Sequence, residues 1–234
     1  MTCRDYRRAM DTPVVLLDID GTLVDSTYHH ALAWHRAFAR HRVDVPMWRI
    51  HRSIGMGGDK LVPAVAGDAV EADLGDALRE LWEQEYAGLL DEVTALPGAR
   101  DLVVDLQQRG HVVVLASSGA ERFSHEAVRL LDIADEVSAV TSSSDAEESK
   151  PEADILGVAL DRVSGERAVV VGDTPYDVEA AARIGLACAA VLTGGFSRAE
   201  LEEAGAALVV GTPGDLVGRD WDSLLRTARR SDEG

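Results

Sequence analysis

Cysteine is nearly absent from this sequence. The 234 residues contain only two, Cys3 and Cys188. Two isolated cysteines cannot build a disulfide scaffold or a zinc site, and they suit a reducing compartment. Long apolar runs are absent too: nowhere do about eighteen apolar residues follow one another, and the first residues lack the apolar segment of a signal peptide. We therefore expect a soluble, cytoplasmic protein with no membrane partner.

Basic residues are scarce relative to acidic ones. The chain has 23 lysines and arginines against 41 aspartates and glutamates, which gives a formal charge of −18. This overall field disfavours binding to a nucleic-acid backbone or to an anionic membrane. A small anionic substrate remains compatible with it, because charges more than about 8–10 Å apart are screened at physiological salt. A site for such a substrate has to contain its own cation.

Six short aliphatic runs are separated by helical patterns. The runs are continuous rather than alternating, which is typical of βα units in a parallel sheet covered on both faces. They occupy residues 14–17, 112–116, 137–140, 168–171, 189–192 and 207–210. Apolar spacing also predicts a helix from Ala99 to Leu106 with Gly110 just beyond it. Thr174 and the proline after it predict a helix that stops near Gly185.

The first two runs are about ninety residues apart. A single crossover helix needs far fewer residues. Two apolar stripes at helical spacing fill the interval, one of Ala31, Trp34 and Phe38, the other of Leu74, Leu78, Leu81 and Trp82. We therefore expect an all-helical insertion at residues 27–95, after which Leu96-Pro97-Gly98 returns the chain to the main domain.

Polar residues follow several of the predicted strands. Asp18 and Asp20 follow the first, Ser117 follows the second and Asp173 follows the fourth, with Lys150 in the loop before that fourth strand. Open parallel sheets bind ligands outside the carboxyl ends of their strands, so we expect these side chains to converge. Asp18 and Asp20 lie on one face of an extended chain, where their repulsion raises one pKa unless a cation intervenes.

This set of residues suits phosphoryl chemistry. Carboxylate and carbonyl oxygens favour a hard ion such as Mg²⁺, which commonly bridges to phosphate. An ionised aspartate beside it can attack phosphorus, and a second carboxyl, held protonated, can donate to the leaving oxygen and later activate water. Ser117 and Lys150 would hold the phosphoryl oxygens by hydrogen bond and by charge.

Each of these residues also has a structural interpretation. Paired acids after a strand are often only a turn or a helix cap, and Ser117 or Lys150 alone says little. Asp177 lies at the N3 position behind Thr174, where a carboxylate stabilises a helix, and this role has the same weight as metal support. The joint placement at strand ends favours a functional site.

Four ordered motifs resemble those of the haloacid dehalogenase-like superfamily. They are Asp18-Ile-Asp-Gly-Thr22, Ser117, Lys150-Pro151 and Gly172-Asp-Thr-Pro-Tyr-Asp177. The resemblance spans nearly the whole chain and is strongest to phosphoglycolate phosphatases and the related β-phosphoglucomutases. It implies a Rossmann-like three-layer α/β/α core of residues 1–26 and 96–234 and a helical cap domain of residues 27–95. It also implies Mg²⁺-dependent hydrolysis of a small phosphorylated metabolite through an aspartyl-phosphate.

The same resemblance implies individual roles. Asp18 becomes the nucleophile and Asp20 the acid and base. The implied metal ligands are Asp18, Asp20 through its backbone carbonyl, Asp173, and Asp177 directly or through water. Ser117 and Lys150 bind phosphate, and Thr22 and Ser118 are further candidates for phosphate binding.

Two departures within the superfamily favour a phosphatase. Dehalogenases lack the second motif acid, which is present here as Asp20. The mutases carry a basic residue that grips a distal phosphate in the cap segment corresponding to residues 54–59, where this chain has glycines. A β-phosphoglucomutase-like mutase remains the alternative, with Lys60 or Arg52 in place of that basic residue.

Two features of the predicted cap have competing interpretations. The segment from Gly55 to Lys60 fits no phosphate-loop pattern and follows no strand, so we expect a flexible cap turn that faces the active site. His30 matches a cap-hinge histidine of the mutases. A partly exposed helix face is the simpler interpretation of His29, His30 and His35.

A phospho-acceptor module resembling a response-regulator receiver is a more distant alternative. Such modules also place an aspartate, a hydroxyl and a lysine around Mg²⁺, but their acceptor follows a later strand and they have no cap. Asp20, poised to activate water, favours turnover over storage of the phosphoryl group. The sequence identifies neither the substrate nor the oligomeric state.

Overall fold

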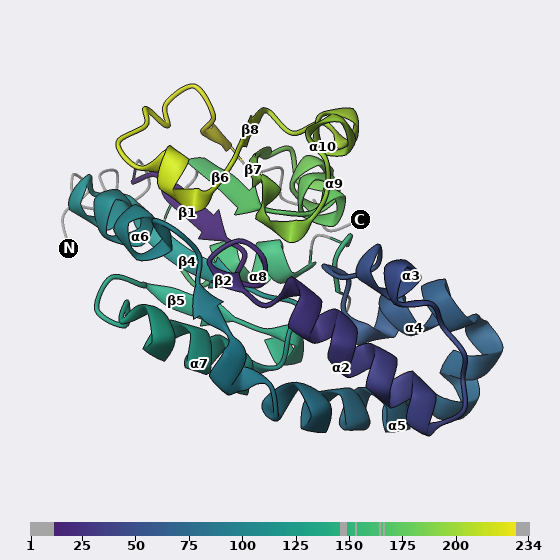
Figure 1. Cartoon of the computed structure of the whole chain (residues 1–234). Helices are drawn as coiled ribbons and strands as arrows, with labels where there is room; N and C mark the ends of the chain where they lie inside the picture. The colour runs from purple at the N-terminus through teal and green to yellow at the C-terminus, as the bar shows by residue number, and fades with distance from the viewer. Residues whose placement is uncertain (1–11, 146–148, 153, 164, 166, 228–234) are drawn as a thin grey trace.

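A parallel sheet forms the centre of the protein (Figure 1). The computed structural model describes residues 12–145, 149–152, 154–163, 165 and 167–227, so Cys3 lies outside the described residues. The strands run in the order β5-β4-β1-β6-β7-β8, with β9 antiparallel to β6. Their bounds are β1 Val14–Leu17, β4 Val112–Ala116, β5 Ala139–Thr141, β6 Arg167–Gly172, β7 Ala187–Val191, β8 Leu208–Val210 and β9 Arg226–Thr227. All six predicted strands are confirmed.

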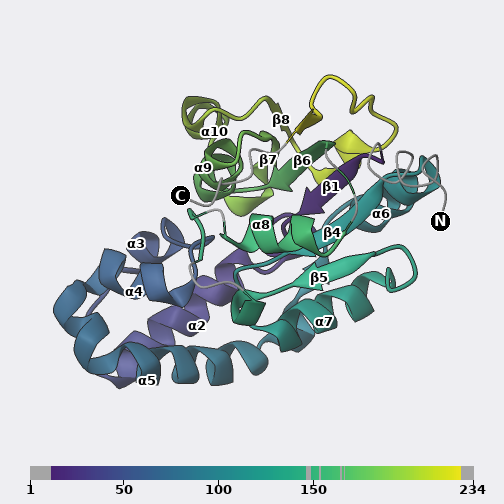
Figure 2. The same cartoon turned by 180° about the vertical axis from the view of Figure 1, so that it is seen from behind.

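Helices cover both faces of the sheet (Figures 1 and 2). Val15 and Leu17 of β1 pack into one apolar cluster with α6 and α7, whereas Val14 and Leu16 pack into another with α8 and α9. The bounds are α6 Ala99–Gln108, α7 Glu121–Leu131, α8 Asp154–Asp161, α9 Pro175–Arg183 and α10 Arg198–Ala204. Because β1 buries both faces, its sequence is continuously aliphatic. The predicted α/β fold, a Rossmann-like sheet between helical layers, is confirmed.

Some predicted bounds are displaced. The run at 137–140 begins too early, because Val137 donates its N–H to Ile133 in a turn and the strand starts at Ala139. The strand expected at 189–192 begins at Ala187, and Leu192 already opens a 3₁₀ turn. Lys150 does not lie directly before the fourth predicted strand, since α8 comes between them.

Four helices form the insertion between β1 and β4. They are α2 Thr27–Arg40, α3 Met47–His51, α4 Gly58–Ala66 and α5 Asp68–Ala87. Both predicted stripes pack together in an apolar cluster separate from the two clusters of the sheet. The four helices lie beyond the end of the sheet (Figures 1 and 2). None of the helices in the described part of the chain combines the length and apolar character needed to cross a membrane.

The two chain segments that join this insertion to the sheet pair with each other. β2 (Val24–Asp25) leads into the helices and β3 (Thr94–Ala95) leads out, and they form an antiparallel pair. Short 3₁₀ turns complete the described structure at Leu90–Glu92, Ser143–Asp145, Leu192–Gly194 and Pro213–Leu216. The paired connection fixes where the helical insertion leaves and re-enters the sheet domain.

The backbone at Gly98, where the chain re-enters the sheet domain, leaves no room for a side chain. Its φ is +78°, and a Cβ placed on it would lie 2.3 Å from the Cα of Gly214. We predict that Gly98→Ala lowers the free energy of unfolding by about 2 kcal/mol or more, because it adds left-handed strain to a backbone clash. Gly157→Ala is the matched control, because that helical glycine has nothing within 4 Å of an added Cβ.

Urea unfolding followed by circular dichroism measures both variants. The control should gain up to about 1 kcal/mol, the usual effect of replacing glycine by alanine in a helix. Equal stability of the two variants would contradict the account of Gly98.

Candidate active site

The strand register brings the predicted site residues to one edge of the sheet. β1 lies between β4 and β6, and Leu17 pairs with both Leu115 and Val171. The next residue, Asp18, donates its backbone N–H to the carbonyl of Val171 at 2.9 Å. The residues that follow the three strands therefore emerge side by side, at the point where the strand order reverses.

Lys150 joins two of the acids at this edge. Its Nζ lies 2.5 Å from Oδ1 of Asp18 and 2.7 Å from Oδ1 of Asp177, and it also donates to the carbonyl of Ala116 at 3.2 Å. The lysine is 2% exposed. Burial alone lowers the pKa of a lysine, but the charges of Asp177 and Asp18 outweigh it and raise the pKa of Lys150. The ammonium group therefore stays charged.

Three buried acids surround this single cation. Ligand oxygens of Asp18, Asp173 and Asp177 all lie within 4.8 Å of one another. Burial, with the charges of Asp177 and Asp20, raises the pKa of Asp18 to about 7, even though Lys150 opposes the shift. Burial and the charges of Asp18 and Asp177 also raise the pKa of Asp173 well above its usual range. The cluster carries more negative charge than Lys150 can balance.

One carboxylate oxygen of Asp173 has space and, in the described part of the chain, no donor around it, as a ligand of a further cation would. Its Oδ2 is buried and has no hydrogen-bond partner among the described residues. A Cβ on Gly194 would lie 1.8 Å from this oxygen and one on Gly21 would lie 2.3 Å from it, so two glycines make room for it. A buried carboxylate oxygen without a donor is costly, and hard divalent cations bind such oxygens. The residues present therefore fit a metal ion.

The hydroxyl of Thr22 contacts an acid of the cluster. Its hydroxyl is fully buried and donates to Oδ1 of Asp173 at 3.0 Å. The side chain is not among the described residues that line the pocket above the acids. Thr22 therefore orients a carboxylate in this structure, and its assignment to phosphate binding stays a prediction.

Asp177 has the predicted helix-cap role and also belongs to the acidic cluster. Its Oδ2 accepts hydrogen bonds from the N–H of Thr174 at 3.1 Å and from the hydroxyl of Thr174 at 2.7 Å. The N–H of Asp177 in turn donates to the Thr174 hydroxyl, which completes a capping box at the start of α9. Its other oxygen pairs with Lys150. The helix cap therefore fixes a carboxylate that belongs to the acidic cluster.

Asp20 has a different environment from the other acids. Its Oδ1 accepts from the hydroxyl of Ser26 at 2.6 Å and lies 2.9 Å from Nε2 of His30. Burial raises the pKa of Asp20, but the charge of His30 and these hydrogen bonds outweigh it and lower the pKa below its usual range. The protonated carboxyl expected from the sequence is therefore not the favoured form in this structure, because His30 and Ser26 stabilise the carboxylate.

The simpler interpretation of His30 was wrong. His30 is only 6% exposed and stacks on Tyr86 with ring centroids 3.8 Å apart, while its imidazole contacts Asp20. His29 and His35 are partly exposed, as expected. The apolar spacing of α2 predicts which residues are buried, but it does not reveal a polar partner on another segment.

The two serines after β4 lie at the bottom of the same pocket. The hydroxyl oxygen of Ser117 accepts from the N–H of Gly119 at 3.0 Å, and the residue is 2% exposed. The hydroxyl of Ser118 is buried and has no partner among the described residues. Both serines line the pocket. These positions are compatible with the predicted phosphate-binding roles of Ser117 and Ser118, which stay predictions.

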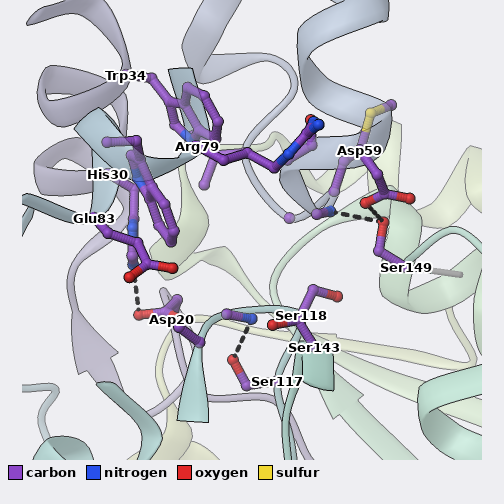
Figure 3. Close-up of a pocket in the computed structure, with 18 of the residues that line it drawn as sticks. Asp20, His30, Trp34, Asp59, Arg79, Glu83, Ser117, Ser118, Ser143 and Ser149 are labelled. Carbon is purple, nitrogen blue, oxygen red and sulfur yellow. Dashed lines mark hydrogen bonds and ion pairs between the residues drawn. The ribbon is translucent and has the colours of Figure 1, made fainter. Parts of the chain in front are cut away.

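The pocket lies between the helical insertion and the carboxyl end of the sheet (Figure 3). Its volume is about 310 Å³. Gly55 to Asp59 line it, as predicted for the segment from Gly55 to Lys60. The segment is a turn only up to Gly57, because α4 begins at Gly58. Ser149, next to Lys150, accepts from the N–H of Gly57 at 3.1 Å and donates to Asp59 at 2.5 Å. The insertion and the sheet domain thus meet directly above the acids.

Several residues of this pocket were not predicted from the sequence. Arg79 and Glu83 line it from α5, whereas Asp59 of α4 belongs to the segment that was predicted to face the site. Arg79 donates to both carboxylate oxygens of Glu71 at 2.9 and 3.0 Å, across Gly75. An acid, a glycine and an arginine at four-residue steps share one helix face, and this spacing could have identified the pair.

Comparisons with known proteins agree with the geometry. The family model of haloacid dehalogenase-like hydrolases matches residues 12–185. A validoxylamine A 7'-phosphate phosphatase from Streptomyces hygroscopicus subsp. limoneus is 27% identical over 186 residues, which cover 77% of this chain and 85% of that protein. A phosphoglycolate phosphatase from Pseudomonas putida is 28% identical over 189 residues, which cover 77% and 70%.

A solved structure extends the similarity to the fold. The crystal structure of a hydrolase from Pseudomonas syringae has a TM-score of 0.83 and 30% sequence identity to this chain, and the match covers 88% of this chain and 96% of that one.

Thr22 gives a test of the metal site that does not depend on activity. We predict that Thr22→Val weakens Mg²⁺ binding by about 10- to 100-fold, because the hydroxyl that orients Asp173 is lost. Thr141→Val is the control, because its hydroxyl is also buried but donates to the carbonyl of Leu115. Isothermal titration calorimetry with MgCl₂ measures both. An unchanged affinity in Thr22→Val would show that Asp173 does not ligate the ion.

Proposed function

The chain belongs to the haloacid dehalogenase-like hydrolases, and on that premise we propose that it is a Mg²⁺-dependent phosphatase of small-molecule phosphomonoesters. The observation that carries the proposal is the buried cluster of Asp18, Asp173 and Asp177 around Lys150, with Asp20 beside it, beneath a pocket. Such a cluster has little purpose in a folded core, because uncompensated buried acids are destabilising.

The acids are the residues that would hold the metal. Asp18, Asp173 and the backbone carbonyl of Asp20 are the proposed ligands, and Asp177 supports the site through Lys150 or a water molecule. A bound divalent cation would neutralise charge on the phosphoryl oxygens and favour the ionised form of Asp18. The unpartnered oxygen of Asp173 supports this assignment.

Asp18 is the proposed nucleophile. Its carboxylate attacks phosphorus, the bond to the leaving oxygen breaks, and the aspartyl-phosphate forms on Asp18. Lys150 holds Asp18 in place from one side and supplies a fixed positive charge next to the transferred group. Ser117 and Ser118 follow β4, the neighbour of β1, and donate to phosphoryl oxygens.

Asp20 is the proposed acid and base. Its carboxylate is favoured before substrate binds, but a phosphoryl dianion nearby raises the pKa of such a group and allows it to take up a proton. That proton goes to the leaving oxygen, and the carboxylate then accepts one from the water that attacks the aspartyl-phosphate. Ser26 and His30 hold Asp20 in the orientation that both steps require.

We propose that residues 27–95 act as a cap domain that closes over the site. The insertion has its own apolar cluster, and the chain enters and leaves it through the paired strands β2 and β3. Contacts of Gly57 and Asp59 with Ser149 hold the cap against the segment that carries Lys150. Closure of this kind excludes bulk water from the reacting groups.

A phosphosugar mutase is the second candidate, and Arg79 is the observation in its favour. The sequence suggested Lys60 or Arg52 as a replacement for the missing basic residue. Arg52 pairs with Glu200 instead, whereas Arg79 lines the pocket beside Gly58. Arg79 could therefore contact a distal phosphate, although two carboxylates already bind it.

The proposed nucleophile is tested by Asp18→Asn. We predict that the variant lowers kcat for p-nitrophenyl phosphate with Mg²⁺ by about four orders of magnitude or more, because the amide cannot form the phosphoryl ester. Asp135→Asn is the matched control, since Asp135 is exposed and does not line the pocket, and it should keep wild-type activity. Circular dichroism checks that both variants are folded.

Acid-quenched single turnovers complete this test. The wild type should carry phosphate on the protein and release it repeatedly, and Asp18→Asn should carry none. One equivalent of stable phosphoprotein without turnover would favour the phospho-acceptor alternative. Wild-type activity in Asp18→Asn would falsify the covalent mechanism.

A further inference from the structure

The cap side of the pocket has an aromatic and aliphatic wall. Trp34 and Trp82 both line it, and their rings stack with centroids 5.3 Å apart and planes 13° apart. Ile54 and Met56 extend this surface. The pocket volume of about 310 Å³ lies at the lower end of the range for small-molecule sites. A two-carbon leaving group would fill only part of this volume, and water would occupy the rest. The wall suits the apolar face of a ring.

The polar groups on the cap side are mainly acids. Asp59 and Glu83 line the pocket in addition to the acids of the sheet domain. In the view of Figure 3, Glu83 lies on the side of Asp20, and Asp59 lies beside Ser149 on the opposite side. Glu83 pairs with Arg122 at 3.0 Å, yet its side chain is still 41% exposed. These carboxylates accept hydrogen bonds from hydroxyl or ammonium groups and repel anions.

Arg79 is the only basic side chain among the described residues that line the pocket, apart from the histidine that contacts Asp20. Its guanidinium donates to Glu71 and to Asp76, each at 2.9 Å, and to the carbonyl of Gly58 at 3.3 Å. Two carboxylates thus outweigh one positive charge. A second anionic group on the substrate would find no net positive charge on the cap side.

From these observations we infer the class of substrate, on the basis of the phosphatase function proposed above. The leaving group is an uncharged or amine-bearing ring with several hydroxyl groups, of the sugar or cyclitol type, and it carries no carboxylate or second phosphate. The ring lies against the tryptophan wall, and its hydroxyl or ammonium groups donate to Asp59 and Glu83. This class excludes phosphoglycolate and sugar bisphosphates as preferred substrates.

The test compares kcat/KM of the wild-type enzyme with Mg²⁺ over four substrates. Glucose 6-phosphate and glucosamine 6-phosphate represent the inferred class, and phosphoglycolate and glucose 1,6-bisphosphate carry the excluded anions. We expect each of the first two to exceed each of the second two by at least about tenfold. A smaller advantage, or preference for either anionic substrate, overturns the inference.

Hydrolysis of p-nitrophenyl phosphate distinguishes failure of the inferred substrate class from failure of the proposed phosphatase function. If that ester is hydrolysed but the ring phosphates have no advantage, only the inferred class fails. If it is not hydrolysed, the proposed function fails and the inference fails with it. Isomerisation of glucose 1-phosphate in the presence of the bisphosphate, faster than phosphate release, also overturns the inference, because it requires a distal phosphate site.

Glu83→Gln tests the contribution of the cap charge. We expect kcat/KM for phosphoglycolate, relative to glucosamine 6-phosphate, to rise about threefold, because one like charge is removed. Glu80→Gln is the matched control, since Glu80 lies on the same helix, is exposed and does not line the pocket. Its ratio should stay at the wild-type value. An equal change in kcat/KM for both substrates in Glu83→Gln would mean that Glu83 only positions the cap through its ion pair with Arg122. That result would contradict the inference.

Discussion

A buried imbalance of charge is the constraint on which the rest of the site depends. Three carboxylates, those of Asp18, Asp173 and Asp177, share one edge of the sheet with a single buried ammonium, that of Lys150. Burial destabilises each unbalanced charge, and it therefore raises the pKa values of Asp18 and Asp173. A divalent cation would supply the missing positive charge, so the same feature that destabilises the metal-free fold would create affinity for a metal.

The surrounding structure serves to hold this imbalance in place. The capping box of α9 binds one oxygen of Asp177 and leaves the other to Lys150. Thr22 fixes one oxygen of Asp173, and the absence of side chains at Gly21 and Gly194 leaves space at the other. Asp20, only two residues from Asp18, is kept apart from the cluster by its hydrogen bonds to Ser26 and His30. Two neighbouring acids can therefore have different protonation behaviour and different roles.

Much of this arrangement was predictable, because it depends on short stretches of sequence. A continuously aliphatic strand followed by polar residues indicates both a parallel sheet and the edge at which its ligands bind, and the cap at Thr174 is a local pattern. The contacts that could not be predicted depend on the path of the chain in space. Thr22 reaches Asp173 across 151 positions. His30 is only 10 positions from Asp20, but their contact depends on how α2 leaves β2. Helical periodicity predicted the stripe of Trp34 but not that its ring would form a pocket wall.

The most direct test of the charge imbalance is the stability of Asp173→Asn measured with and without Mg²⁺. The substitution keeps the shape of the side chain and an acceptor for Thr22, but removes one buried negative charge. Without metal, the account predicts that the variant unfolds at a higher urea concentration than the wild type, because repulsion within the cluster is relieved. Its free energy of unfolding should be higher by on the order of 1 kcal/mol. With millimolar Mg²⁺ the order should reverse, because only the wild type gains binding energy from the ion. A variant less stable than the wild type in both conditions, by the same amount, would contradict the account.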